Sequence, residues 1–77
     1  MTMQTLNARR LLCPLPVIRT QDKIKLMQAG EQLEIIATDP GVMQDIPTWS
    51  RINGHRVVSM VVADGEYVIV VEVGVNG

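Results

Sequence analysis

The chain has 77 residues, of which 47% are apolar, with seven basic against eight acidic residues and a net charge of −1. This length fits a single domain, 1–77, with a small but sufficient core. The balanced charge offers no general attraction to nucleic acid, and two aromatic residues, Trp49 and Tyr67, are too few for a base-stacking platform. No apolar run could cross a bilayer, and residues 1–10 lack the apolar segment of a signal peptide. We therefore expect a soluble, cytoplasmic protein with no direct nucleic-acid or membrane partner.

The first half of the chain alternates between strand and helix patterns. A short strand is predicted over Thr5–Ala8, and good helix formers predict a helix over Pro14–Ala29. Residues Glu31–Thr38 alternate apolar and polar side chains, which is typical of a strand buried mainly on one face. The residues Asp39-Pro40-Gly41 then predict a turn.

The second half predicts a helix and then a hairpin. Apolar residues recur there at helical spacing, namely Val42, Ile46, Trp49 and Ile52. Because Pro47 has no backbone N–H, we expect a loose first turn and a helix that starts near Asp45. The β-branched runs His55–Ala63 and Glu66–Val73 are joined by Asp64-Gly65, the strongest hairpin signal in the chain, so these strands should pair antiparallel.

The predicted element order is β-α-β-α-β-β. Right-handed crossovers would place both helices on one face of a four-stranded mixed sheet. The expected fold class is therefore an α/β (α+β) two-layer sandwich. The run Tyr67–Val71 contains only Tyr, Val and Ile and would be a risk on an open edge, so we expect its strand to be central or covered.

Cys13, the only cysteine, lies in the run Leu11-Leu12-Cys13-Pro14-Leu15-Pro16. Because proline suits the first turn of a helix, Cys13 is predicted to be the N-cap of the first helix. A thiol there faces unpaired N–H groups and the positive end of the helix dipole, which should lower its pKa below about 8.5 and favour the nucleophilic thiolate. The alternative is that Cys13 is unreactive and serves as a small buried hydrophobic residue. One cysteine excludes an internal disulfide and a cysteine-based zinc site, and we expect neither metal nor cofactor.

Five further features allow a structural and a functional interpretation. Asp39 is interpreted mainly as shaping its turn, with a role beside the thiol as the secondary alternative, and Asp45 is interpreted as the N-cap of the second helix. Trp49 is expected to pack in the core rather than dock a partner, and His55, without a metal-ligand or triad companion, is expected to be structural. The basic residues of the first helix form either a donor-binding surface or, as we prefer, a solvated face; they are Arg19, Lys23 and Lys25.

Three motifs stand at specific spacings: Leu12-Cys13-Pro14-Leu15-Pro16, Ala37-Thr38-Asp39-Pro40-Gly41, and Asp45-Ile46-Pro47 with Trp49 two positions on. With Leu6-Asn7-Ala8-Arg9, Gly30 and Gly54-His55, they make nearly the whole chain similar to the TusA (SirA-like) family of sulfur carriers. The resemblance implies that Cys13 accepts sulfane sulfur as a persulfide from a cysteine desulfurase or rhodanese-like donor. It further implies transfer to an acceptor protein in tRNA thiolation, cofactor sulfuration or sulfur oxidation. Such a carrier acts stoichiometrically, so its status as an enzyme stays open.

Two positions depart from the family pattern, which commonly has Asp and Gly where this chain has Asn7 and Arg10. We expect Pro14 and Pro16 to support the thiol geometry. Arg9 and Arg10 either lower the Cys13 pKa, or meet an acidic patch on a donor, or are merely solvated. We expect the departures at Asn7 and Arg10 to alter the choice of partner proteins more than the chemistry at Cys13.

Two other classes of function compete with the carrier. In the first, the chain is an interaction or regulatory module in which Cys13 is incidental and the valine-rich sheet or basic helix binds a partner. In the second, it is a small thiol peroxidase, which we rank last because a resolving cysteine and a visible base are missing. Replacing Cys13 by serine distinguishes the first two hypotheses. Loss of sulfur loading and of downstream function would support the carrier, and an intact effect on the partner would support the module.

Overall fold

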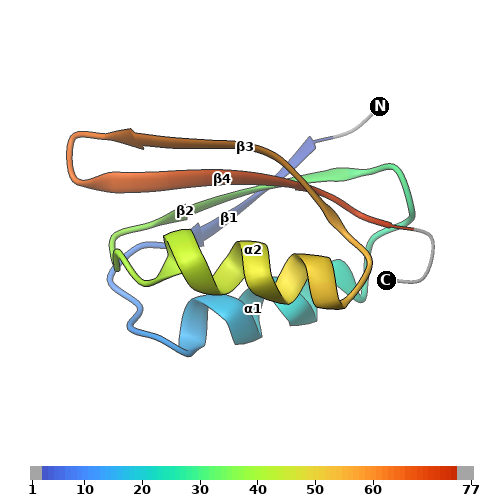
Figure 1. Cartoon of the computed structure of the whole chain (residues 1–77), viewed down its shortest axis with the longest axis horizontal. Coiled ribbons are helices and arrows are strands. Elements are labelled where there is room, and N and C mark those ends of the chain that lie inside the picture. The colour runs from blue at the N-terminus through green and yellow to red at the C-terminus, as the bar shows by residue number, and fades with distance from the viewer. Residues whose placement is uncertain (1–2, 75–77) are drawn as a thin grey trace.

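The computed structural model describes residues 3–74, which form a sheet covered on one face by two helices (Figure 1). The elements in chain order are β1 (Met3–Ala8), α1 (Leu15–Ile24), β2 (Gln32–Ala37), α2 (Val42–Ile52), β3 (Arg56–Ala63) and β4 (Glu66–Glu72). The strand order is β1-β2-β4-β3, with β1 and β2 parallel and β4 antiparallel to both of its neighbours. The predicted two-layer sandwich with a four-stranded mixed sheet is therefore confirmed.

The core lies between the sheet and the helices, and β2 and β4 form its centre. Leu33 and Ile35 of β2 are fully buried, as are Ile69 and Val71 of β4, and the register places Ile35 opposite Ile69. Their alternation with more exposed neighbours matches the period of two that a half-covered strand requires. The expectation that β4 is central is confirmed, and it explains how so apolar a strand is kept from solvent.

The β3–β4 connection is a tight two-residue turn. Asp64 and Gly65 both adopt left-handed backbone conformations, with φ of 53° and 76°. Two positive φ values in succession give a turn whose twist matches that of the strands it joins, and aspartate followed by glycine tolerates them well. The predicted antiparallel hairpin is confirmed.

The first helix is shorter than predicted. It ends at Ile24 rather than near Ala29, because the amides of Leu26 and Met27 donate to carbonyls only three residues back. Such bonds tighten the chain into turns instead of continuing the α-helix. Good helix formers fill this segment, so the pattern alone could not show where the helix stops.

The second helix begins earlier than predicted, at Val42, and Pro47 lies inside it. Its first turn is ordered because the amides of residues 42–45 donate to carbonyls of residues 39–41. Val42 and Ile46 are fully buried, so packing against the sheet stabilises the turn that Pro47 was expected to loosen. The interpretation of Asp45 as the N-cap is therefore wrong, since Asp45 lies within the helix.

Candidate functional site

Cys13 lies in the loop between β1 and α1, and its side chain is exposed. The predicted N-cap position is wrong. Pro14, joined to Cys13 by a cis peptide bond, precedes the helix, and Pro16 occupies its first turn. The helix start also offers the sulfur few donors, because the Leu15 amide bonds to the Leu12 carbonyl and Pro16 has no N–H.

A single carboxylate ties the cysteine loop to the loop between β2 and α2. The backbone amide of Cys13 donates to Oδ2 of Asp39 at 2.8 Å, and the amide of Gly41 donates to Oδ1 at 3.1 Å. These bonds lower the pKa of Asp39, because both favour its ionised form. Asp39 therefore does more than shape its own turn.

Gly41 makes room for the sulfur. A Cβ at this position would lie 3.0 Å from Sγ of Cys13 and 3.5 Å from Oδ1 of Asp39, and the first of these distances is closer than ordinary packing allows. The φ of Gly41 is −59°, a value open to any residue. Glycine therefore leaves the sulfur room that any other residue would take unless the thiol shifted by a few tenths of an ångström, and its value here is space and not backbone freedom.

Two carboxylates hold the thiol in its protonated form. Hydrogen bonds from the thiol to Asp45 and Asp39 are the main cause that raises the pKa of Cys13 from 9.0 to about 12, with burial and charge repulsion adding to them. A carboxylate accepts the S–H bond but repels a thiolate, so the neutral form is favoured. The expectation that the pKa of Cys13 is lowered is wrong. The sulfur lies beside two carboxylates and not beside unpaired N–H groups of a helix start, so its pKa is raised.

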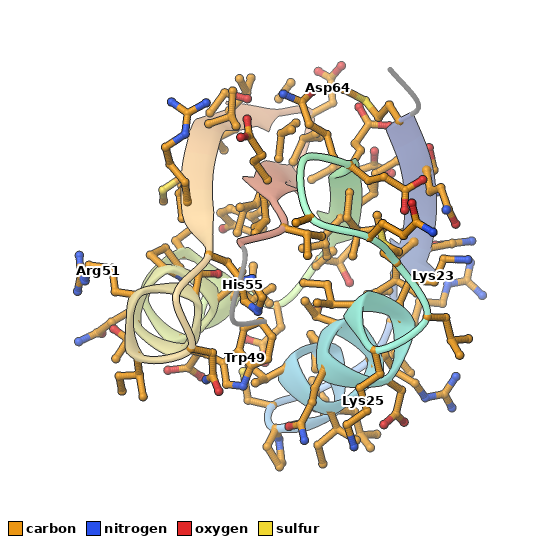
Figure 2. The ribbon with its side chains drawn as sticks, turned by 90° about the vertical axis from the view of Figure 1, so that its right-hand side faces the viewer. Lys23, Lys25, Trp49, Arg51, His55 and Asp64 are labelled. Carbon is orange, nitrogen blue, oxygen red and sulfur yellow. The ribbon has the colours of Figure 1, made fainter. Side chains whose placement is uncertain are left out.

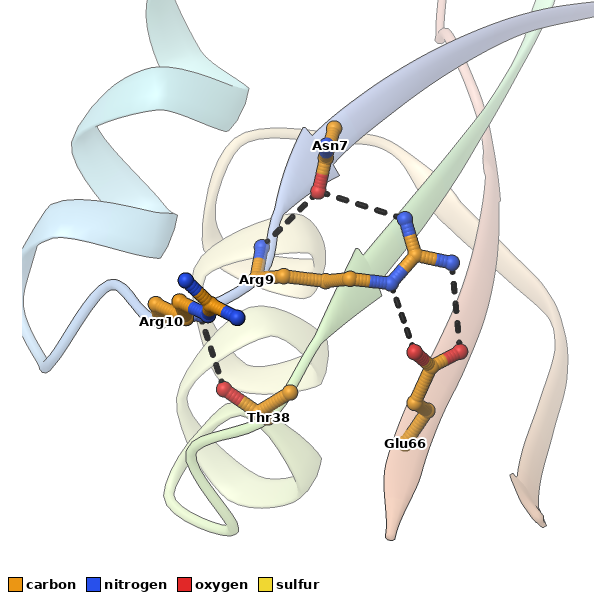
Figure 3. Close-up of polar contacts among 5 residues, drawn as sticks. All are labelled: Asn7, Arg9, Arg10, Thr38 and Glu66. Carbon is orange, nitrogen blue, oxygen red and sulfur yellow. Dashed lines mark hydrogen bonds and ion pairs between the residues drawn. The ribbon is translucent and has the colours of Figure 1, made fainter. Parts of the chain in front are cut away.

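Arg9 is engaged away from the thiol. Its guanidinium forms a two-point ion pair with Glu66 at the start of β4, with distances of 2.6 Å from Nε and 3.2 Å from Nη2 (Figure 3). Oδ1 of Asn7 accepts bonds from the backbone amide and Nη1 of the same arginine. Both partners are more than one third exposed, so the pair contributes little to stability, although the pKa of Glu66 is lowered by it. None of the causes that shift the Cys13 pKa involves an arginine.

Arg10 adopts a backbone conformation that glycine would adopt without strain. Its φ is 65°, and its amide donates to Oγ1 of Thr38 at 2.8 Å, which fixes the bend after β1 (Figure 3). A side chain in the left-handed region costs about 1–2 kcal/mol.

An open groove of about 420 Å³ runs between α1 and α2 beside the thiol. Pro14 and Asp45 line its end next to Cys13, and Val17, Trp49 and Ile52 supply apolar walls. Trp49 packs against the core, as predicted, while part of its side chain faces this groove. A protein that approaches the sulfur therefore meets an apolar surface immediately beside it.

His55 stacks on Trp49 beneath the sheet, with ring centroids 5.2 Å apart (Figure 2). Its Nδ1 accepts the amide hydrogen of Gly74 at 3.0 Å, and only 6% of the residue is exposed. The structural interpretation of His55 agrees with this placement. Figure 2 shows Lys23, in the last turn of α1, and Lys25, just after it, directed away from the core, and Arg19 of the same helix is exposed.

Burial lowers the pKa of His55 below 6.5, which predicts a loss of stability in mild acid. Between the folded and unfolded pKa values the unfolded chain binds more protons, so the free energy of unfolding falls as the pH falls through this window. We expect urea denaturation from about pH 7 to about pH 5 to show a smaller loss for His55→Gln than for the wild type. Equal losses in both proteins would show that carboxylates alone cause the acid sensitivity.

Among residues 3–74, no group of three or more His, Cys, Asp or Glu side chains is placed to hold a metal ion. Neither α1 nor α2 has the length and apolar character that a membrane-spanning helix needs.

Around Cys13, the described part of the chain brings together one thiol, two carboxylates and a close-fitting glycine. The sequence pointed to Cys13 and Pro14 but missed Asp45 and Gly41 as neighbours of the thiol and gave Asp39 only a secondary role.

Comparison with known proteins places nearly the whole chain in one family. A family model described as "Sulfurtransferase TusA" matches residues 4–73. "Putative sulfur carrier protein NMA0882" of Neisseria meningitidis is 35% identical over 72 residues, which cover 94% of this chain and 97% of that protein. "Sulfur carrier protein TusA" of Allochromatium vinosum is 33% identical over 83% of this chain and 84% of its own length. "Putative sulfur carrier protein YrkF" of Bacillus subtilis is 43% identical over 51 residues, 66% of this chain, but the match spans only 28% of that longer protein.

Proposed function

Because the chain belongs to the TusA sulfurtransferase family, we propose that it is a sulfur carrier that holds sulfane sulfur as a persulfide on Cys13. The observation that carries the proposal is the exposed thiol, held by Asp39 and Asp45 at the end of an open apolar groove. A carrier must offer its sulfur to other proteins, so exposure serves it better than a closed pocket. The donor is a cysteine desulfurase or rhodanese-like protein, the receiver is an acceptor protein, and the compartment is the cytoplasm.

Loading is a sulfur transfer between thiols. The sulfur of Cys13, as the thiolate, attacks the outer sulfur of the donor persulfide, a new S–S bond forms on Cys13, and the donor S–S bond breaks to release the donor thiolate. The S–H proton passes by way of Asp39 or Asp45, which already accept its hydrogen bond, to the departing thiolate. No oxidant is consumed, because the sulfane sulfur and its oxidation state move together.

Delivery repeats the same chemistry in the opposite direction. A thiolate of the acceptor attacks the terminal sulfur of the Cys13 persulfide, and Cys13 leaves as a thiolate that recovers a proton beside the two carboxylates. Asp39 and Asp45 favour the neutral thiol, so they favour protonation of the released Cys13 sulfur once the S–S bond has broken. The groove beside Pro14 gives the approaching partner an apolar contact.

The proposal is tested by intact-protein mass spectrometry. The chain is incubated with a cysteine desulfurase and cysteine, or with a rhodanese and thiosulfate, with Cys13→Ser as the matched control. We expect a gain of about 32 Da, removable by a reductant, in the wild type and none in the variant. A folded wild-type protein that gains no sulfur from either donor would contradict the proposal.

A further inference from the structure

Strand β3 lies at an edge of the sheet and presents an unusually apolar free side. Its only neighbour among residues 3–74 is β4, and the segment from Val57 to Ala63 contains neither charge nor proline. Four of its residues are large, apolar and at least 39% exposed, namely Val58, Met60, Val61 and Val62. A free edge of this kind is a template for pairing with another strand.

The other features of this edge do not protect it. Figure 1 shows the far end of the β3–β4 hairpin extending beyond α2, so the helices leave that end of β3 uncovered. A β-bulge between Val57 and Ser59 disturbs only the beginning of the strand, and Ser59–Ala63 pairs with β4 without interruption. The opposite edge strand, β1, differs because polar residues interrupt it, namely Gln4, Thr5 and Asn7. Charges, proline and bulges normally shield edges, and the regular part of β3 has none of them.

The charges at the two ends of β3 indicate what pairs with it. Arg56 begins the strand, its side chain is 69% exposed, and only its Nη2 is engaged, by Glu72. Asp64 follows the strand directly and takes part in neither ion pair of the described residues. In antiparallel pairing of two β3 strands, the Arg56 end of each meets the Asp64 end of the other. Parallel pairing would instead put like charges together, which is unfavourable.

We propose that the free edge of β3 binds β3 of a second copy of this chain. The pairing is antiparallel about a two-fold axis and joins two four-stranded sheets into one continuous sheet. Exposed valine and methionine side chains pack across the new strand pair. At each of its two ends, Arg56 of one copy lies near Asp64 of the other. Because Cys13, Asp39 and Asp45 lie outside β3, both sulfur sites stay open, and the pairing is independent of the proposed function.

Analytical ultracentrifugation over a range of protein concentrations tests this pairing. The wild type is expected to approach twice the monomer mass, and Val61→Lys, which adds a charge to the exposed edge, is expected to weaken the dimer about tenfold or more, equivalent to about 1.4 kcal/mol. Thr5→Lys on β1 is the matched control and should leave the dimer unchanged. Circular dichroism checks that both variants fold. A wild type that stays monomeric at every concentration, or a dimer indifferent to Val61→Lys, would overturn the proposal.

Two further measurements test the strand direction. Asp64→Asn keeps a residue that tolerates the left-handed turn, and it should weaken the dimer and reduce the sensitivity of its dissociation constant to salt. Amide exchange should show protection of edge-facing amides within Ser59–Ala63 that is lost in Val61→Lys. If exchange at those amides is the same in monomer and dimer, the copies associate through another surface and the proposal fails.

Discussion

Replacing Asp39 and Asp45 together by asparagine is expected to raise the rate of Cys13 alkylation near neutral pH by about 10- to 100-fold. The reagent reacts with the thiolate, and the two carboxylates keep the pKa of Cys13 at about 12 instead of 9.0. Each unit by which that pKa falls increases the thiolate fraction about tenfold at a given pH. A more acidic thiol is also a weaker nucleophile, which offsets part of the gain.

Asparagine is the informative replacement because it has nearly the shape of aspartate, and its one side-chain oxygen can still accept the amide hydrogen of either Cys13 or Gly41, which different oxygens of Asp39 accept in the wild type. The charge is thereby removed while one of the two hydrogen bonds between the loops is kept. Glu34→Gln is the matched control, since this carboxylate lies on β2 and contacts Thr5. The measurement is the rate of iodoacetamide reaction against pH, and the curve of the double variant should shift to lower pH. An unshifted curve would show that the carboxylates do not set the state of the thiol.

Ile35→Ala should destabilise the fold by about 2–5 kcal/mol. Ile35 is fully buried in β2 and lies opposite Ile69 at the centre of the sheet, so its truncation leaves a cavity that the surrounding strands cannot close. Domains are typically stable by about 5–15 kcal/mol, and small ones lie near the lower limit. A substantial fraction of the variant should therefore be unfolded at ambient temperature.

The neighbouring Ile36 provides the control for this experiment. It lies on the same strand but on the other face of the sheet, where its partner is Val68 and the residue is only partly buried. Ile36→Ala removes the same atoms and should cost clearly less. Urea denaturation followed by circular dichroism measures both changes. Equal losses for the two variants would mean that the helix-covered face is not the main source of stability.

Much of the fold could be predicted because its strands carry strong local signals. The alternation in β2 and the Asp64-Gly65 turn determine which face is buried and where the hairpin reverses. The helix ends were predicted less well, since they depend on which of several local hydrogen bonds forms and on packing against the sheet. The first turn of α2 is closed by carbonyls of residues 39–41, and these bonds outweigh the effect of Pro47.

The candidate site was predicted only in part. Cys13 could be recognised from its surrounding prolines, but its electrostatic environment comes from residues far along the chain. Asp39 and Asp45 belong to motifs whose local pattern indicates a turn and a helix cap. Local patterns cannot show that two carboxylates converge on one sulfur, and this is why the predicted direction of the pKa shift was wrong.

The bond from the Cys13 amide to Asp39 joins residues 26 positions apart, with α1 and β2 between them. The Cys-Pro-Leu-Pro segment is therefore not a portable unit. A short peptide with the same letters, or the same letters grafted onto another scaffold, would carry a thiol with an ordinary pKa near 8.5. Only a chain that has already paired β1 with β2 brings the second loop within reach, so the character of the sulfur is a property of the completed topology.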